Sequence, residues 1–136
     1  MKLMLDTTAY TEKPKGFEIG SISKRIVNNP VDINVEELAT ALGNGKTIVP
    51  ATFRKIGGDI RRSIENWESQ QVIALDFDEG LTLEEAYNNA FFRENAAFMY
   101  TTFSHTEEHH KFRVVFVLDE PVYEYKHFTI FKLLRI

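Results

Sequence analysis

The feature that most constrains the fold is an apolar run, Gln71 to Phe77, near the middle of the chain. Its length suits a β-strand, and apolar side chains occupy both alternating sets of positions, which predicts a strand covered on both faces. Such a strand lies in the interior of a sheet. Together with strand and helix signals that alternate along the rest of the chain, the run predicts an α/β or α+β fold, a small sheet with flanking helices.

Local patterns predict the other elements. Strands are predicted over residues 2–10, 17–22, 46–53, 96–103 and 112–118. Helices are predicted over residues 35–42, 83–92 and from Pro121 to Ile136. The first two helices begin with capping-box patterns, Asn34 with Glu37 and Thr82 with Glu85. Pro50 cannot donate to a β-ladder, which assigns its strand to a sheet edge or a strand end. The polar segment between the last two strands is predicted to be a hairpin loop.

Composition limits the possible classes of protein. The length of 136 residues predicts a single domain over residues 1–136. The absence of cysteine excludes disulfides, thiolate zinc sites and a cysteine nucleophile, and fits a reducing, cytoplasmic setting. No apolar run is long enough for a membrane span, so we expect no membrane partner. The formal net charge of -4 excludes a global positive field, so contacts with nucleic acid are expected to be local.

Two carboxylates lie at the end of the apolar run, at Asp76 and Asp78. Alternation along a strand puts both on one face, where they repel each other unless a cation bridges them. Carboxylate oxygens are ligands that Mg²⁺ and Mn²⁺ prefer, so the pair predicts a divalent-metal site. The alternative is a strand-end turn in which Asp78 to Gly80 reverse the chain and Asp76 accepts hydrogen bonds from backbone amides.

A hydroxyl and an imidazole follow the next predicted strand, at Ser104 and His105. Both groups suit an anionic ligand such as phosphate, close to the metal. The strand that begins with Lys111, Phe112 and Arg113 follows. The order acidic strand, helix, Ser-His strand and basic strand is a strand-helix-strand-strand unit, which is expected to place the acidic and Ser-His strands close in one sheet.

Cations gather near the glycine pair of residues 57–58. Arg54, Lys55, Arg61 and Arg62 flank this pair, with only Asp59 opposing them. With Lys111 they are candidates for contacts to nucleic-acid phosphates. A solvated charged face is the competing interpretation.

The order of these motifs resembles the archaeo-eukaryotic primase and primase-polymerase superfamily, in particular the primase-like replication proteins of phages and plasmids. The segments that carry the resemblance are residues 72–80, 82–86, 100–105 and 111–118. The resemblance implies an RRM-like core, Mg²⁺ or Mn²⁺ bound by Asp76 and Asp78, and metal-dependent nucleotidyl transfer. It implies that His105 contacts the incoming nucleotide, with Ser104 beside it and Arg113 as a further nucleotide ligand. Asp76, Asp78 and His105 are then the catalytic residues, and nucleotide and DNA are the partners.

The chain departs from this family at the third metal-binding motif, a hydrophobic residue followed by an acidic ligand on a later strand. That motif is expected beyond the helix that starts near Pro121, and this chain ends inside that helix. Asp119 and Glu120 follow a strand but differ in position from the third ligand. We therefore expect a partial catalytic core in which nucleotidyl transfer is impaired.

Three alternatives stay open. Asp76 and Asp78 also resemble the first motif of haloacid-dehalogenase phosphatases, although Glu79 interrupts that pattern. Residues 105–109 match the His-x-x-Glu-His pattern of inverted zinc peptidases, which requires a helix. The third alternative is a non-catalytic module on a primase-like scaffold that binds nucleic acid or protein, such as an accessory or inhibitor protein of a mobile element. Its apolar C-terminal helix would contact a second copy or another protein.

Overall fold

The fold is α+β, in a computed structural model that describes residues 1–126. Its elements are β1 (Lys2–Ala9), α1 (Gly16–Val27), β2 (Pro30–Asp32), α2 (Val35–Gly43), β3 (Lys46–Val49), β4 (Ala51–Phe53), β5 (Lys55–Ile56), β6 (Asp59–Ile60), the 3-10 helix η1 (Ile64–Asn66), β7 (Trp67–Phe77), α3 (Leu83–Asn88), α4 (Ala90–Asn95), β8 (Phe98–Thr101) and β9 (Phe112–Val122). Among these residues, no helix has the length and apolar character needed to cross a bilayer.

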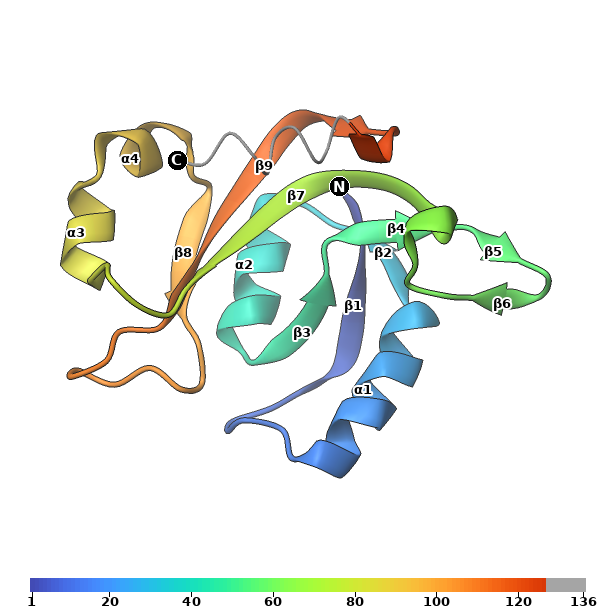
Figure 1. Cartoon of the computed structure of the whole chain (residues 1–136), viewed down its shortest axis with the longest axis horizontal. Coiled ribbons are helices and arrows are strands. Elements are labelled where there is room, and N and C mark those ends of the chain that lie inside the picture. Colours follow the sequence, from blue (N-terminus) through green and yellow to red (C-terminus); the bar gives the residue numbers. More distant parts are fainter. Residues whose placement is uncertain (127–136) are drawn as a thin grey trace.

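The larger sheet has the strand order β4-β7-β9-β8, and all its neighbouring strands are antiparallel. The predicted central position of the apolar run is confirmed, because β7 lies between β4 and β9. Since β9 is antiparallel to both β7 and β8, those two strands run parallel with β9 between them, a split β-α-β arrangement. The expected strand-helix-strand-strand unit is therefore present, and β9 joins the acidic strand to the Ser-His strand (Figure 1).

Both faces of the larger sheet are covered, as the apolar run predicts. On one face, Val72 of β7 and Val115 of β9 pack with α2 and the smaller sheet β2-β1-β3. On the other face, Phe112 and Val114 pack with Ala86 of α3 and Phe92 of α4. The two cores fix β7 and β9 from both sides, so the residues at the ends of these strands have a rigid support.

The predicted strand over residues 46–53 is two strands in two sheets. β3 pairs with β1, and β4 pairs with β7, with Pro50 between them. Each piece lies at a sheet edge, as Pro50 predicts. This residue therefore marks the point where the chain passes from the smaller sheet to the larger one.

The prediction of an extended segment over residues 17–22 is wrong, because these residues belong to α1. Phe17, Ile19 and Ile22 are residue types that are common in strands. The four-residue spacing of Ile22 and Ile26, however, places both on one helix face, where they pack against Met4 of β1. Burial of this face outweighs the weak intrinsic helix propensity of the segment.

The predicted helix over residues 83–92 begins correctly but breaks at Asn89. Its capping residue is confirmed, since the Thr82 hydroxyl accepts a hydrogen bond from the Glu85 backbone amide at 3.1 Å. Asn89 has extended backbone angles, and its side chain accepts from the Phe92 amide at 3.0 Å. A second N-cap therefore starts α4 in place of a continuous helix.

The prediction that Pro121 begins a helix is wrong, because β9 continues to Val122. The register between β7 and β9 shifts between Gln70 and Val72, so Pro121 lies in an irregular part of the ladder, where a missing N–H is tolerated. The Gln71 side chain donates to the Leu118 carbonyl at 2.8 Å within this irregularity. Residues 123–124 have no regular structure and residues 125–126 are helical, so a helix begins later than predicted. The remaining residues of the predicted C-terminal helix, with its suggested partner surface, lie outside the described residues.

Candidate functional site

Three side chains meet across the end of the larger sheet. Asp76 of β7 and Tyr100 of β8 both lie opposite Arg113 of β9 in the strand register. The Arg113 guanidinium donates from Nε to Asp76 Oδ1 at 2.6 Å, from Nη2 to Asp76 Oδ2 at 3.3 Å and from Nη1 to the Tyr100 hydroxyl at 2.8 Å. The antiparallel ladder therefore brings together two residues that the sequence proposed for binding, Asp76 and Arg113, and adds Tyr100.

The electrostatics of this cluster favour a charged arginine. Burial lowers the pKa of Arg113, but the hydrogen bond to Asp76 and the charges around it raise the pKa by more. Burial raises the pKa of the Tyr100 hydroxyl, against the opposing influence of Arg113. The Asp76 side chain stays 53% exposed, so its carboxylate remains in contact with solvent while it pairs with arginine.

Two exposed carboxylates lie near the end of β7, at Asp76 in the strand and at Asp78 just after it. Among residues 1–126, no group of three or more histidine, aspartate or glutamate side chains is arranged to hold a metal ion. Mg²⁺ in phosphate-processing proteins is commonly held by one or two carboxylates together with substrate phosphates, so Asp76 and Asp78 are the residues that could hold such an ion. Arg113, however, must release Asp76 before this carboxylate can bind a cation.

The loop between β8 and β9 carries three histidines, and one of them, His109, contacts the residue that follows β7. His109 Nε2 contacts the Asp78 carbonyl oxygen at 2.5 Å, and this nitrogen must donate because a carbonyl only accepts. His105 Nδ1 accepts from the Lys111 backbone amide at 3.1 Å, and the His105 ring lies 5.0 Å from the His110 ring, centroid to centroid. In neutral His105, Nε2 therefore carries the proton and is available to donate to an anion.

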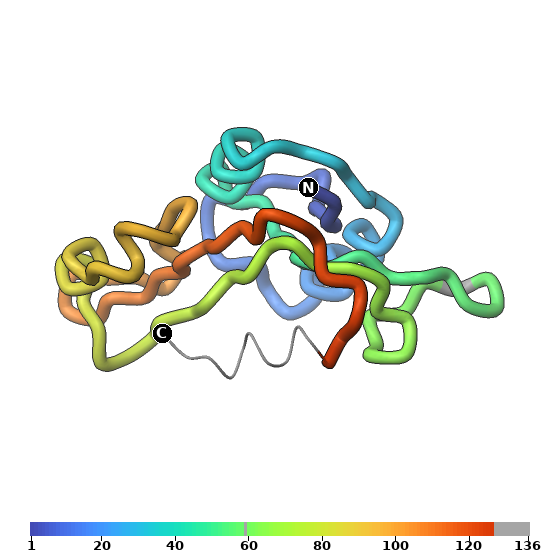
Figure 2. The backbone as a smooth tube through the Cα atoms, turned by 90° about the horizontal axis from the view of Figure 1, so that it is seen from above, coloured from blue at the N-terminus to red at the C-terminus, as the bar shows by residue number. Residues whose placement is uncertain are grey.

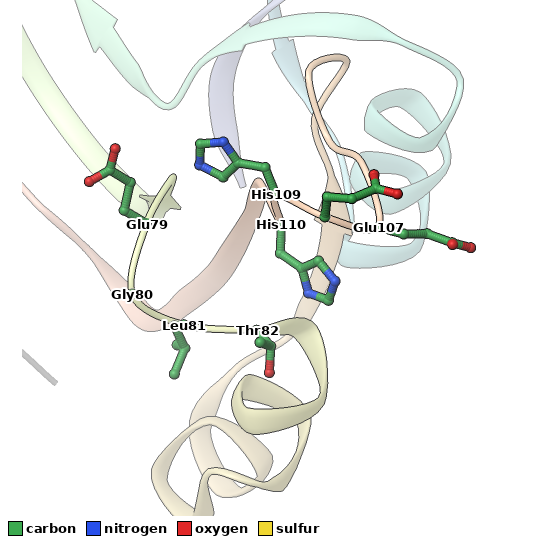
Figure 3. Close-up of a pocket in the computed structure, with 8 residues that line it drawn as sticks. Glu79, Gly80, Leu81, Thr82, Glu107, His109 and His110 are labelled. Atoms are coloured by element: carbon green, nitrogen blue, oxygen red, sulfur yellow. The ribbon is translucent and has the colours of Figure 1, made fainter.

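His110 connects the same loop to the helix that follows β7. Its Nδ1 accepts a hydrogen bond from the Leu83 amide, the first residue of α3, at 2.9 Å. The two loops line a shallow pocket of about 250 Å³ (Figure 3). Its lining residues are Glu79, Gly80, Leu81, Thr82, Glu107, Glu108, His109 and His110. The glutamates repel phosphate, so this pocket is a poor phosphate site. In this respect it differs from the Asp76–Arg113 pair, which contains a cation.

The other predicted binding residues fall into two groups. Ser104 is exposed on the β8–β9 loop, and Lys111 lies at the end of that loop next to Arg113. Arg54, Lys55, Arg61 and Arg62 lie beyond the opposite end of β7, around the hairpin β5–β6 (Figure 1). The structure thus separates the acidic and histidine motifs from the main group of cations. The imidazole of His105 makes no hydrogen bond to Asp76 or Asp78 among the described residues.

Tyr100, His109 and His110 are site residues that sequence reasoning missed. Tyr100 depends on the strand register, which is not encoded in any local motif. The zinc-peptidase pattern includes His109 but not His110, and that interpretation fails because residues 102–111 form turns and bends with no helix. The excess of histidine in one short loop was the available signal.

Comparison of the chain with family models, with curated proteins and with solved structures finds no match. The interpretation of the site therefore depends on its geometry and on the residues themselves.

Proposed function

We propose that this chain is a primase-polymerase-like domain that binds a nucleotide and a divalent cation at the end of β7. One observation carries the proposal: the β7–β9 ladder places the Asp76 carboxylate against Arg113, with Asp78 two residues further and the histidine loop beside it. Acidic, cationic and imidazole groups at one sheet end match the charges of a metal-nucleotide complex. A cytoplasmic location and a DNA partner belong to the same proposal.

In this function Asp76 and Asp78 hold Mg²⁺ or Mn²⁺, which when bound neutralises phosphate charge and orients the phosphoryl group. Arg113 releases Asp76 and donates two N–H groups to phosphate instead. A partly exposed ion pair contributes only about 0–1 kcal/mol, so this exchange costs little. His105 donates from Nε2 to the same phosphates, and the exposed Ser104 hydroxyl lies beside it.

Thermal unfolding in the presence of Mn²⁺ tests the metal part of the proposal. At ten times Kd, the ion should stabilise the wild type by about 1.4 kcal/mol, which corresponds to a rise in Tm of about 4 °C. The Asp76→Asn/Asp78→Asn variant should lose this rise. The matched control Asp119→Asn/Glu120→Gln removes two exposed acids from the other end of β9 and should keep it. Equal rises in all three proteins would contradict the proposal.

A non-catalytic binding module is the second candidate, and the Asp76–Arg113 pair favours it because the pair neutralises one of only two metal ligands. Nucleotide binding and primer extension together separate the candidates. We expect the chain to bind ATP with Mn²⁺ and to show no detectable primer extension, because two carboxylates are too few for two-metal nucleotidyl transfer. Robust extension would contradict the expectation that a third metal ligand is missing, and a failure to bind ATP would reject the proposed function and leave the second candidate.

A further inference from the structure

The hairpin β5–β6 projects from the end of the molecule opposite the candidate site. We call residues 54–62 the basic hairpin. Both Figure 1 and Figure 2 show it at one end, with α3, α4 and the β8–β9 loop at the other. Residues 54–62 contain four of the 16 lysines and arginines of the chain and one of its 20 acids. The chain is acidic overall, so this end carries a local excess of positive charge.

The basic hairpin is anchored at its base and free at its tip. At the base, the Arg54 amide donates to the Asn66 carbonyl at 2.6 Å, and the Asn66 side chain donates back to the Arg54 carbonyl at 3.0 Å. Ile60 packs against the core formed by Met4, Ile22 and Ile26. These contacts hold a short hairpin that would be unstable in isolation.

The tip is a two-residue turn, Gly57-Gly58. Both glycines have positive φ, 63° and 89°, which is the geometry of a tight hairpin turn with the twist of the flanking strands. A side chain added at either glycine would meet no atom within 4 Å, so the turn faces open space. The neighbouring Ile56 side chain is 55% exposed. The tip is therefore free to contact a large partner.

The cations of the basic hairpin differ in their availability. Arg54 donates to the Trp67 carbonyl at 3.3 Å and therefore supports the hairpin base. Arg62 makes a hydrogen bond to the Ser23 hydroxyl at 3.1 Å and stays exposed. Lys55 and Arg61 are exposed and make no ion pair with the side chains that the structure describes, which do not include that of Asp59. Three cations are thus available to phosphates.

We propose that the basic hairpin binds the phosphate backbone of a nucleic-acid duplex about one helical turn from the site at the end of β7. This inference rests on the proposed function, because that function supplies the duplex. β7 has 11 residues and runs between the two ends of the molecule, and ten steps of about 3.3 Å separate its first and last Cα atoms by roughly 33 Å. One turn of B-DNA is about 34 Å. Because both faces of β7 are covered, the duplex would lie on the molecular surface with its axis parallel to this strand, and it would then present a phosphate backbone to both ends.

Salt-dependent binding of a labelled 20-base-pair primer–template measures the hairpin contacts. Each lysine or arginine that neutralises a phosphate contributes about 0.9 to the slope of log K against log salt. The Lys55→Gln/Arg61→Gln/Arg62→Gln variant should lower this slope by about 2.7. Between 50 and 200 mM salt, the wild type should therefore lose about 40-fold more affinity than the variant does.

The matched control is Lys2→Gln/Lys13→Gln/Arg93→Gln, which removes three exposed cations outside the hairpin. We expect this control to keep the wild-type slope, and circular dichroism to show that all three proteins are folded. Equal slopes for the hairpin variant and the wild type would overturn the inference. The inference would also be overturned if the hairpin variant bound the duplex like the wild type but no longer bound phosphatidylserine vesicles. That result would assign the hairpin to a membrane surface.

Crosslinking tests the spacing without removing any charge. Ile56→p-benzoylphenylalanine should crosslink the duplex about 8–12 base pairs from the primer terminus. Crosslinks scattered along the duplex would contradict the spacing. If the slope changes but Mn²⁺ fails to stabilise the wild type, the hairpin contact stands and the proposed function fails. If Mn²⁺ stabilises the protein through Asp76 and Asp78 and the slope is unchanged, only the hairpin inference fails.

Discussion

Arg113 makes hydrogen bonds to two partners on two neighbouring strands, and its substitution should separate their roles. Arg113→Gln leaves the Asp76 carboxylate and the Tyr100 hydroxyl without their main donor. The free carboxylate should bind Mn²⁺ up to about fivefold more tightly, because no ion pair has to be broken first. The fold should lose about 1 kcal/mol of stability.

Calorimetric titration with Mn²⁺ and urea unfolding measure these two effects. Arg93→Gln is the control, since Arg93 is an exposed cation that stacks over Tyr87 on the opposite face of the sheet. An Mn²⁺ affinity that falls in Arg113→Gln would show that the arginine assists the cation and does not compete with it.

A second aspartate–arginine pair lies between β1 and α1. Asp6 of β1 is fully buried, and Arg25 of α1 donates to both its oxygens at 2.7 and 2.9 Å. Burial raises the pKa of Asp6, but Arg25 and the Thr8 amide lower it by more, so the net direction is downward. The pair joins α1 to β1 through a charged contact inside the core.

Asp6→Asn should cost about 3 kcal/mol at pH 7, because it leaves Arg25 without its buried acceptor. A lowered pKa stabilises the fold above the unfolded value of about 3.9, and this stability is lost as the pH falls through the folded pKa. The difference in unfolding free energy between the wild type and Asp6→Asn should therefore decrease below about pH 4. Urea unfolding at pH 7 and near pH 3 checks this. Asp32→Asn, at an exposed pair, should change stability by less than 1 kcal/mol.

At the scale of elements, the turn from α2 into β3 depends on one glycine. Gly45 has a φ of 90°, and a Cβ there would overlap the Tyr10 carbonyl oxygen. Gly45→Ala should destabilise the protein by about 2–4 kcal/mol through backbone strain and overlap. Gly43, at the end of α2, has no atom within 4 Å of an added Cβ. Gly43→Ala should therefore be neutral or stabilise by up to about 1 kcal/mol.

Thermal unfolding of the two alanine variants provides this comparison directly. Similar melting temperatures for Gly45→Ala and Gly43→Ala would mean that the turn relaxes at little cost and that its close approach to β1 is unimportant.

The elements show which sequence signals were sufficient. The capping patterns at Asn34 and Thr82 located two helix starts correctly, because an N-cap is a local hydrogen bond. The helix α1 was missed because its stability comes from burial against β1, which no local pattern contains. The prediction from Pro121 failed because the preference of proline for a helix start is only local. A register shift in the β7–β9 ladder accommodates this proline in a strand.

At the scale of the whole molecule, the sequence could name some members of the candidate site but not their pairings. Asp76 and Arg113 were both chosen from the sequence, yet only the antiparallel register places one against the other. Tyr100 joins them for the same reason. Partner identity across strands depends on the fold, so it was outside the reach of motif reasoning.

The two ends of β7 have opposite electrostatic characters. The Phe77 end bears carboxylates, glutamates and histidines, and the Trp67 end bears the basic hairpin. A nucleic-acid partner on the molecular surface, parallel to this strand, would place a metal-bound phosphate at the Phe77 end. Its backbone phosphates at the Trp67 end would contact the cations of the basic hairpin. This division explains how an acidic chain could hold a polyanion through local contacts.

Paramagnetic broadening of amide NMR signals by Mn²⁺ tests the central claim most directly, because the effect falls off steeply with distance from the ion. We expect substoichiometric Mn²⁺ to broaden the signals of residues 76–79 and of Arg113 first, and we expect Asp76→Asn/Asp78→Asn to abolish this selectivity. Broadening centred on Glu107 and Glu108, or spread evenly over the acidic surface, would contradict a cation site at the end of β7.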